Sequence, residues 1–340
     1  MSARKLTMTE AINEALHIAM ESDPDVIVLG EDVAGGGDRA DQGIEDAWGG
    51  IFGATRGLIG RFGRERVLDT PISEMGFLGT AVGAAATGLR PVAELMFIDF
   101  LGVSLDPLLN QASKLRYMFG GKAKVPLVVR TSSGAGQRAA AQHSQTLYGI
   151  TTGIPGLKTV VPSNPADAKG LLLAAIRDDD PVVFCEPKSL MRETGEVPEG
   201  DYQVDLGKAA TVRTGSDVSL IGIGRTVATC LAAARELAAA GIEAEVLDLR
   251  SLQPMDETAI LATLEKTGAV VVVDEDTPRC GVASDIAALC VDRGFDFLDA
   301  PVRTITAPHT PVPFSPVLED AFLPSASQVT QTVREILQGV

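Results

Sequence analysis

The stretch Asp69-Thr70-Pro71-Ile72-Ser73-Glu74-Met75-Gly76-Phe77 connects a short strand, predicted at 66–69, to a helix predicted at 74–89. Pro71 ends the strand, and Ser73 is a favourable N-cap for the helix. The helix has so few charged residues that we expect burial on nearly all sides, which would place Glu74 in a dry site. On these local features alone, an acid that only stabilises the first turn of its own helix is the better interpretation.

Outward from this stretch, predicted strands alternate with predicted helices in both directions. The first half of the chain has strands predicted at 26–29, 66–69, 91–97, 125–131, 159–161 and 181–185, and helices at 105–118 and 165–177. The second half has strands predicted at 218–221, 244–249, 269–273 and 297–298. This alternation predicts an α/β fold with two doubly wound, mostly parallel sheets. Proline, glycine and charged residues interrupt the pattern at 188–206, so we expect a linker there between domains of residues 1–187 and 207–340.

The composition argues against several classes of protein. A net charge of −16 does not suit nucleic acid or an anionic membrane as a partner, although it suits docking of a basic protein module. The four cysteines have no C-x-x-C spacing, so we expect free thiols, mostly buried, in a reducing compartment. The three histidines are not clustered, which argues against a zinc site. Because no long apolar run follows the N-terminus or occurs elsewhere, we expect no signal peptide, no membrane span and a cytoplasmic protein.

Over nearly its whole length, the sequence resembles the beta subunit of the thiamine-diphosphate-dependent first component of 2-oxo-acid dehydrogenase complexes. The similar blocks keep their order from one end of the chain to the other. They are residues 30–33, 69–77, 88–91, 140–145, 155–158, 167–171 and 248–250. The resemblance implies a transketolase-like pyrimidine-binding domain, followed by a domain like the C-terminal domain of transketolase.

Within this family, the chain most resembles the acetoin-cleaving branch. The similarity lies in the region between Val33 and Gly60, which includes Ala47-Trp48-Gly49-Gly50, and in the segments 138–141 and 307–314. The implied reaction cleaves acetoin, releases acetaldehyde and transfers the remaining two-carbon unit to a lipoyl group on an acyltransferase. A beta subunit acting on pyruvate or branched-chain oxo acids is the nearest alternative. A docking subunit without catalytic groups is an alternative from another class.

The resemblance changes the interpretation of several side chains. It implies that the Glu74 carboxyl bonds the far ring nitrogen of the cofactor's aminopyrimidine, so that the cofactor's own amino group can act as a base. It implies that Phe100 stacks on this ring and that Met96 lines its pocket, although both also suit a core. Glu31 matches an acid of a water-filled passage near the cofactor, and a solvated loop acid is an equal alternative.

His143 follows a flexible segment and lies between Gln142 and Ser144, so it has no helical or strand face to fill. A histidine in such a loop can transfer protons near neutral pH. The resemblance places an active-site histidine at this position. His309 lies in a loop of the second domain, and we expect it to stiffen that loop or its interface.

The sequence contains no Gly-Asp-Gly, the motif with which related enzymes bind the metal of the diphosphate. The resemblance therefore implies that an alpha subunit holds Mg²⁺ and the diphosphate, in a heterotetramer of two alpha and two beta chains. It also implies that the second domain forms the contact between beta chains and docks the acyltransferase. We expect residues 274–279 of that domain to form an exposed charged turn.

Some relatives bind potassium near a helix end, and the resemblance extends to that region. The matching positions are Leu127, Ala175, Ile176, Asp178 and Asp180. An acidic loop that faces solvent is the alternative interpretation of residues 178–180.

Overall fold

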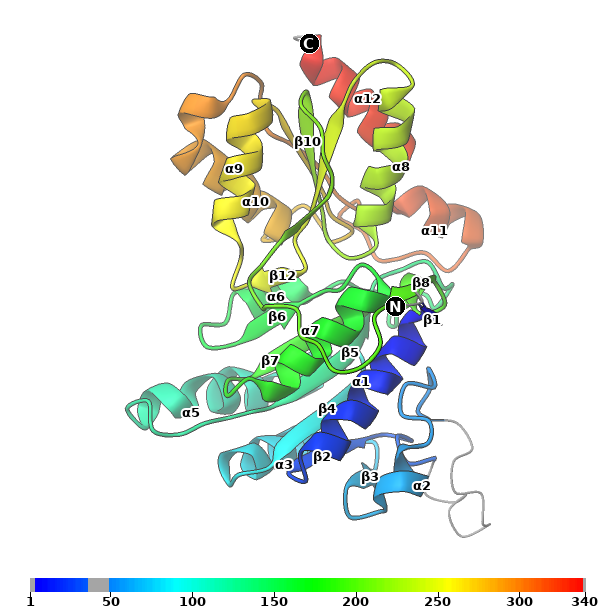
Figure 1. Ribbon diagram of the computed structural model, residues 1–340, viewed down its shortest axis with the longest axis vertical. Coiled ribbons are helices and arrows are strands. Elements are labelled where there is room, and N and C mark those ends of the chain that lie inside the picture. Colours follow the sequence, from blue (N-terminus) through cyan, green and yellow to red (C-terminus); the bar gives the residue numbers. More distant parts are fainter. Residues whose placement is uncertain (1–3, 36–48, 339–340) are drawn as a thin grey trace.

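The computed structural model describes residues 4–35 and 49–338. It consists of two α/β units, one above the other along the longest axis (Figure 1). Ala47 and Trp48, which contribute to the acetoin resemblance, lie outside the described residues. Within the described ranges, no helix is long and apolar enough to cross a bilayer.

The first unit is built on a seven-stranded sheet with the order β12-β6-β7-β5-β4-β2-β3. Its strands are β2 (Val26–Gly30), β3 (Val67–Asp69), β4 (Arg90–Phe97), β5 (Val128–Ser133), β6 (Lys158–Val160), β7 (Val182–Pro187) and β12 (Ser251–Gln253). All neighbours are parallel except β12, which runs antiparallel to β6. The predicted α/β class with mostly parallel strands is confirmed.

Helices cover both faces of this sheet, as the alternating pattern predicts. They are α1 (Met8–Ser22), α2 (Leu58–Phe62), α3 (Glu74–Ala86), α4 (Leu101–Asp106), α5 (Ser113–Met118), α6 (Tyr148–Thr152) and α7 (Pro165–Arg177). Along β2, Val26 and Val28 pack with α1 and α7, whereas Ile27 and Leu29 pack with α3 on the other face. Because successive side chains of a strand point to opposite faces, a strand covered on both sides is apolar throughout.

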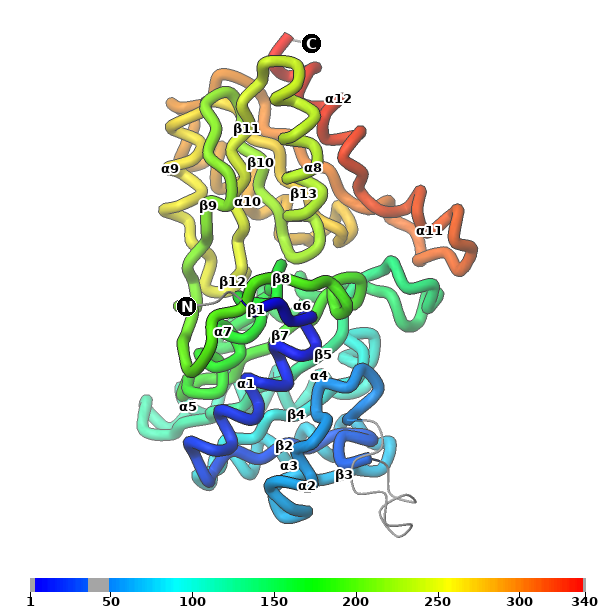
Figure 2. Tube along the Cα trace, turned by 45° about the vertical axis from the view of Figure 1, so that its right-hand side comes forward, coloured from blue at the N-terminus to red at the C-terminus, as the bar shows by residue number. Residues whose placement is uncertain are grey.

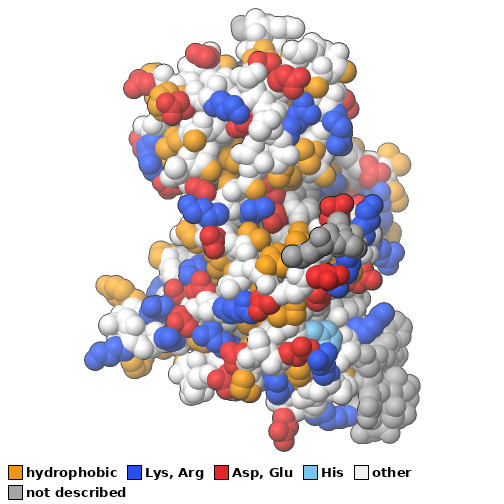
Figure 3. Space-filling view, in the orientation of Figure 1, with side chains coloured by type: hydrophobic (Ala, Val, Ile, Leu, Met, Phe, Trp, Pro, Cys, Tyr) orange, Lys and Arg blue, Asp and Glu red, His pale blue; other side chains and the backbone are white. Residues whose placement is uncertain are grey.

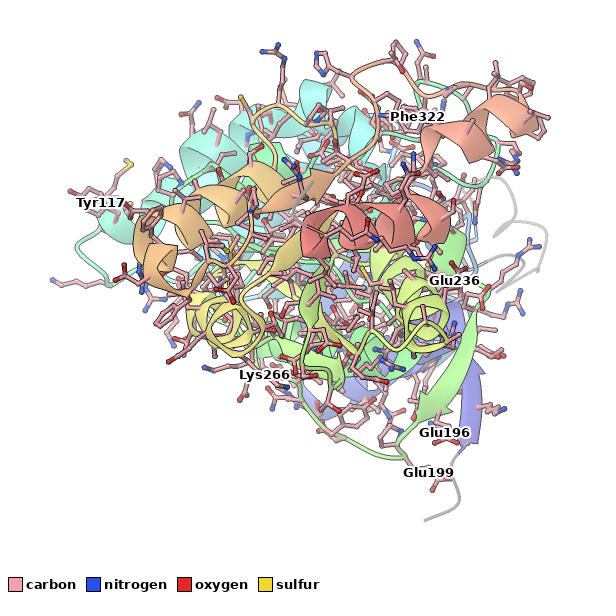
Figure 4. All side chains as sticks on the ribbon, turned by 90° about the horizontal axis from the view of Figure 1, so that it is seen from above. Tyr117, Glu196, Glu199, Glu236, Lys266 and Phe322 are labelled. Carbon is pink, nitrogen blue, oxygen red and sulfur yellow. The ribbon has the colours of Figure 1, made fainter. Side chains whose placement is uncertain are left out.

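The helix predicted at 105–118 is longer and less regular than expected. Short turns η2 (Ile98–Phe100) and α4 precede a π-helical segment, η3 (Pro107–Ala112), and α5 completes the run. Proline has no backbone N–H group to donate to a regular helix, and the π-helical segment begins at Pro107. The end of α5 projects from the body, and Tyr117 marks its tip in the view from above (Figure 4).

The expected linker at 188–206 is ordered structure packed on the first unit. It contains η4 (Lys188–Leu190) and β8 (Thr194–Val197), and β8 pairs antiparallel with β1 (Arg4–Thr7). This two-stranded sheet lies near the boundary between the units (Figure 2). The charge and proline content of 188–206 obscured its buried residues, among them Lys188 and Val197.

The second unit is a five-stranded sheet with the order β14-β13-β10-β11-β9. Its strands are β9 (Ala210–Arg213), β10 (Val218–Gly222), β11 (Ala244–Asp248), β13 (Val270–Val273) and β14 (Arg303–Ile305). Its helices are α8 (Thr226–Ala238), α9 (Glu257–Thr267), α10 (Val282–Arg293), η5 (Phe295–Phe297), α11 (Pro316–Phe322) and α12 (Ala326–Leu337). The prediction of a strand at 297–298 is wrong, because Phe297 ends a short 3₁₀ turn and the edge strand is β14.

The turn at 274–279, expected to be exposed, begins with three buried acids. Asp274, Glu275 and Asp276 are 0%, 7% and 8% exposed. The expectation failed because the turn packs against the 134–147 loop of the first unit, a contact that local sequence cannot reveal. Tyr148, directly after this loop, donates its hydroxyl to Asp274, and a Cβ added at Gly134 would clash with the carboxylate of Glu275.

Buried acids at the boundary between the units predict that stability falls as pH rises. Burial raises the pKa of Asp248, Glu275 and Asp276 to about 7 in each case. Their unfolded pKa values are roughly 4. The folded state therefore favours the neutral acids, and this contribution is complete at low pH and lost as pH rises through about 7. We expect a loss of roughly 1 kcal/mol per group between pH 6 and 8, seen as a fall in Tm.

The variant Asp248→Asn tests this pH dependence. The introduced amide carries no titrating proton, so the Tm of the variant should fall less steeply between pH 6 and 8 than that of the wild type. Asp292→Asn changes an exposed aspartate and serves as the control. Identical slopes for all three proteins would contradict the prediction.

Candidate active site at the carboxyl edge of the first sheet

Five neighbouring strands of the first sheet end at one edge, because β3, β2, β4, β5 and β7 are parallel. In parallel sheets, ligands bind at this edge. Glu74 follows β3, Glu31 follows β2, Phe100 follows β4, and the loop of His143 follows β5. The residues expected from the sequence therefore come to the same side of the sheet.

The start of α3 differs from its prediction in two ways. Ser73 occupies the N-cap position, but its hydroxyl donates to the Pro71 carbonyl (3.1 Å) and makes no cap hydrogen bond. One side of α3 is exposed rather than buried, and Ile72 and Met75 are 84% and 58% exposed. The small, uncharged residues of this side leave an open face on the single chain, so Glu74 is half-buried instead of dry.

Glu31 and Glu74 form a pair of acids at the ends of adjacent strands. Burial raises the pKa of Glu31, and the charges of Glu74, Asp32 and Glu94 raise it further. The Oε1 atom of Glu31 is buried and has no hydrogen-bond partner among the described residues. A low-dielectric site beside other acids favours the protonated form of Glu31.

An aromatic cluster brings Phe100 and His143 together. Their ring centroids are 5.5 Å apart, and Phe97 contacts both, at 5.6 Å from Phe100 and 4.9 Å from His143. Phe52 adds an edge contact to Phe97 at 5.8 Å. Met96 precedes Phe97 where the pairing of β4 with β5 shifts register. Phe97 and Phe52 were not expected; the sequence signal for Phe97 is its place three residues before Phe100, and no sequence signal pointed to Phe52.

The loop of His143 is attached to the second unit through Glu319 of α11. The buried Glu319 carboxylate accepts from the backbone N–H of Gly136 (2.8 Å) and of Arg138 (3.1 Å), and from the Arg138 guanidinium (2.6 Å). Gln145 donates to Asp99, next to Phe100. Contacts from both units therefore restrain the segment that carries His143.

A buried charge cluster supports the sheet just behind this edge. Arg130 of β5 is 1% exposed and binds Glu94 of β4 (2.9 Å) and Glu186 of β7 (2.7 Å). Burial raises the pKa of Glu186 to about 6, against the opposing effect of Arg130. A charged residue in the interior of each of three neighbouring strands is the sequence signal that could have revealed this cluster.

Comparison with known proteins identifies the two units. The transketolase pyrimidine-binding domain model matches residues 4–194, and the transketolase C-terminal domain model matches residues 207–329. A solved split-gene transketolase, described as an inactive beta4 tetramer, has the same fold with a TM-score of 0.77 at 22% identity, over 98% of both chains.

Relatives of similar length identify the family more narrowly than the domain models do. The chain is 59% identical to the beta subunit of acetoin:2,6-dichlorophenolindophenol oxidoreductase of Bacillus subtilis, over 98% of both chains. It is 55% identical to the same subunit of Cupriavidus necator, over 99% of both. The pyruvate dehydrogenase E1 beta subunit of Bacillus subtilis is 42% identical over 98% of this chain and 99% of its own. The chain belongs to the beta-subunit family of thiamine-diphosphate-dependent dehydrogenases. This confirms the resemblance stated from the sequence.

In this beta subunit, the residues at the sheet edge fit the aminopyrimidine end of thiamine diphosphate. The Glu74 carboxyl group is of a kind that can hydrogen-bond a ring nitrogen, the partly buried Phe100 has an aromatic face, and Glu31 adds a second acid at the same edge. Within the described residues, no group of three or more His, Cys, Asp or Glu side chains could hold a metal ion. The described part of the beta subunit thus fits one end of the cofactor and offers no such ligand group for the metal.

The possible potassium region of the beta subunit is already occupied by cationic side chains. The Arg90 guanidinium donates to the carbonyls of Ile176 and Asp178 (3.1 Å each). The Lys158 amine donates to the Asp178 carboxylate at 2.6 and 2.8 Å, and lies 3.5 Å from Asp180. Residues 178–180 are therefore partly buried and paired, unlike a solvent-facing acidic loop. The potassium site stays a prediction.

Proposed function

We propose that this chain is the beta subunit of an acetoin dehydrogenase. The observation that carries the proposal is the contrast in identity: 59% and 55% to two acetoin-oxidoreductase beta subunits, against 42% to pyruvate dehydrogenase beta subunits. The enzyme cleaves acetoin, releases acetaldehyde and passes the two-carbon unit to a lipoyl group of an acyltransferase.

Glu74 holds the catalytic proton in this proposal. When bound, thiamine diphosphate supplies the nucleophilic carbon that makes cleavage next to a carbonyl possible. With the cofactor bound, the Glu74 carboxyl would hold the far nitrogen of the aminopyrimidine ring, Phe100 would orient that ring, and Met96 would line its pocket. Glu31, whose pKa is raised by burial and by Glu74, keeps a second proton within the same edge of the sheet.

His143 transfers protons on the substrate side of the site. Its ring is held edge-on by Phe97 and Phe100, and its loop is held by Glu319. A base held in one orientation loses little entropy when the substrate binds. The same contacts restrict the approach of water to the reacting carbon.

An alpha subunit completes the site. It supplies Mg²⁺ and the groups that hold the diphosphate, since Gly-Asp-Gly is missing from this sequence. The open face of α3 and the tip of α5 offer apolar contact area, with Tyr117 and Met118 87% and 68% exposed. On the face drawn in Figure 3, basic and acidic side chains are intermingled, which suits protein partners more than a polyanion. The two-alpha two-beta assembly and the cytoplasmic location stay predictions.

Co-expression with the cognate alpha subunit tests the proposal. The purified complex is assayed for dye reduction with acetoin, pyruvate and branched-chain oxo acids. Turnover of acetoin well above that of the oxo acids supports the acetoin assignment. Turnover of pyruvate alone would move the chain to the pyruvate branch, and full activity of the beta chain alone would contradict the shared site. No turnover in any complex would favour the docking role.

A further inference from the structure

Lys188 lies at the same edge of the first sheet as the candidate active site. It directly follows β7, the neighbour of β5, and begins η4. Its side chain is 1% exposed, and its Nζ atom has no hydrogen-bond partner among the described residues. Burying an amine without a hydrogen-bond partner costs free energy. Such an amine is therefore expected where water or a ligand accepts its hydrogen bonds.

A second buried lysine shows what a purely structural role looks like in this chain. Lys169 of α7 is 0% exposed, but its Nζ donates to Glu14 (3.0 Å) and to the Pro198 carbonyl (3.0 Å). It also lies 4.8 Å from the centroid of the Tyr202 ring. The bonds that Lys169 makes to its neighbours therefore explain its burial, whereas no such bonds explain the burial of the Lys188 amine.

The Lys188 amine faces the aromatic cluster of the candidate site. Its Nζ lies 5.2 Å from the centroid of Phe97, the ring that contacts both His143 and Phe100. Gln137 donates to the backbone carbonyl of Lys188 (2.5 Å), which ties the lysine to the loop of His143. The amine thus borders the aromatic cluster that holds His143 and Phe100.

Three acids surround the amine without binding it. Burial lowers the pKa of Lys188, while Asp99, Glu275 and Glu319 oppose that effect. Each acid has another partner: Asp99 accepts from Gln145, Glu275 from Thr146, and Glu319 from the 136–138 segment. Arg138 pairs with Glu319, and Arg225 lies 3.5 Å from Glu275, so the charges around the amine are largely balanced and a neutral ligand is tolerated.

Three further buried polar atoms near the amine have no hydrogen-bond partner within the described part of the chain: Asp99 Oδ2, Ser144 Oγ and Glu275 Oε2. Arg225 lies 3.5 Å from Glu275 Oε2. Ser144 and Glu275 line a neighbouring cavity, whereas Lys188 is not among its lining residues. This cavity of about 300 Å³ lies between the 135–147 loop and the second unit. Ser144, Glu275 and Phe322 are among its lining residues, and Figure 4 labels Phe322 on α11. The space is large enough for a small organic molecule.

We propose that Lys188 is a substrate-binding residue whose Nζ donates a hydrogen bond to an oxygen of a neutral hydroxy ketone. This inference rests on the proposed function and specifies which side chain binds the substrate oxygen. The ammonium group stabilises negative charge that develops on the carbonyl oxygen during attack. No proton needs to leave Lys188 for this role.

Kinetics of the alpha–beta complex test the inference with two variants of Lys188. Lys188→Met keeps the side-chain volume and removes the donor, and we expect kcat/KM for acetoin to fall about 100-fold. In the wild type, activity should fall at alkaline pH as the amine deprotonates, and this limb of the profile should be missing in Lys188→Met. The acids Asp99, Glu275 and Glu319 face the amine, so the profile is also measured in Glu275→Gln, which should retain the alkaline limb.

Lys169→Met is the matched control. It should lower Tm and leave kcat/KM and the shape of the pH profile of the folded complex unchanged. If Lys188→Met does not assemble, Lys188→Gln decides, since it keeps a neutral donor of similar length and should raise KM for acetoin at least fivefold with the alkaline limb lost. A folded Lys188 variant with wild-type kinetics would overturn the inference, whereas a wild type inactive on acetoin would overturn the proposed function instead.

Discussion

Glu74→Gln should remove nearly all turnover of the assembled enzyme and leave the fold unchanged. Glutamine matches the size of glutamate but cannot hold and share the proton that the aminopyrimidine needs. A positioned acid of this kind contributes roughly 10²–10⁴-fold to a rate. Because Glu74 is half-buried and follows a cap position without a cap hydrogen bond, its replacement removes little stability. Dye reduction with acetoin measures the first effect, and Tm measures the second.

Glu65→Gln is the matched control for this loss. Glu65 lies shortly before β3, is exposed, and is outside the sheet edge that carries the site. Its replacement should leave turnover within twofold of the wild type. Wild-type turnover in Glu74→Gln would end the assignment of this residue as the proton-holding acid.

Arg130→Leu should destabilise the protein by about 3–5 kcal/mol, the usual cost of removing one partner from a buried charge cluster. The replacement leaves the carboxyl groups of Glu94 and Glu186 buried, close together and without a cation. Arg130 opposes the effect of burial on Glu186, so the folded pKa of Glu186 would rise further in the variant. The stability lost in the variant should therefore be greatest at high pH and partly recovered at low pH. Denaturant unfolding at several pH values measures this.

The triple variant Glu94→Gln, Arg130→Leu, Glu186→Gln separates charge from packing. With the acids neutralised, most of the lost stability should return, because no uncompensated charge remains in the sheet. Equal instability of the single and triple variants would mean that the volume of Arg130, and not its charge, holds the strands together.

Most of the first sheet is predictable from the sequence because its strands are buried on both faces. Runs such as 26–29 and 181–185 are apolar throughout, and a proline or glycine marks many of their ends. The edge strand β14 was missed because Arg303-Thr304-Ile305 has no apolar pattern. Pairing of β12 with β6 was also unpredictable, since it joins segments about ninety residues apart through only three residues.

The candidate site also contains residues that the sequence predicts and residues that it does not. Glu31, Glu74, Phe100 and His143 follow strands that the sequence predicts, and a family resemblance assigns them roles. Phe97, Arg130 and Lys188 could not be recognised as part of the site from the sequence, because their roles depend on contacts with side chains that are distant in the chain. The buried acids after β13 depend on packing between the two units, which local charge patterns misrepresent.

Strand β12 has a consequence for any attempt to divide this polypeptide. Although it follows residue 206, it completes the sheet of the first unit beside β6. A gene cut at that point would yield an N-terminal fragment whose β6 border presents bare amide and carbonyl groups, a template for self-association. Such fragments should precipitate when produced separately and regain solubility only when both halves are made in the same cell.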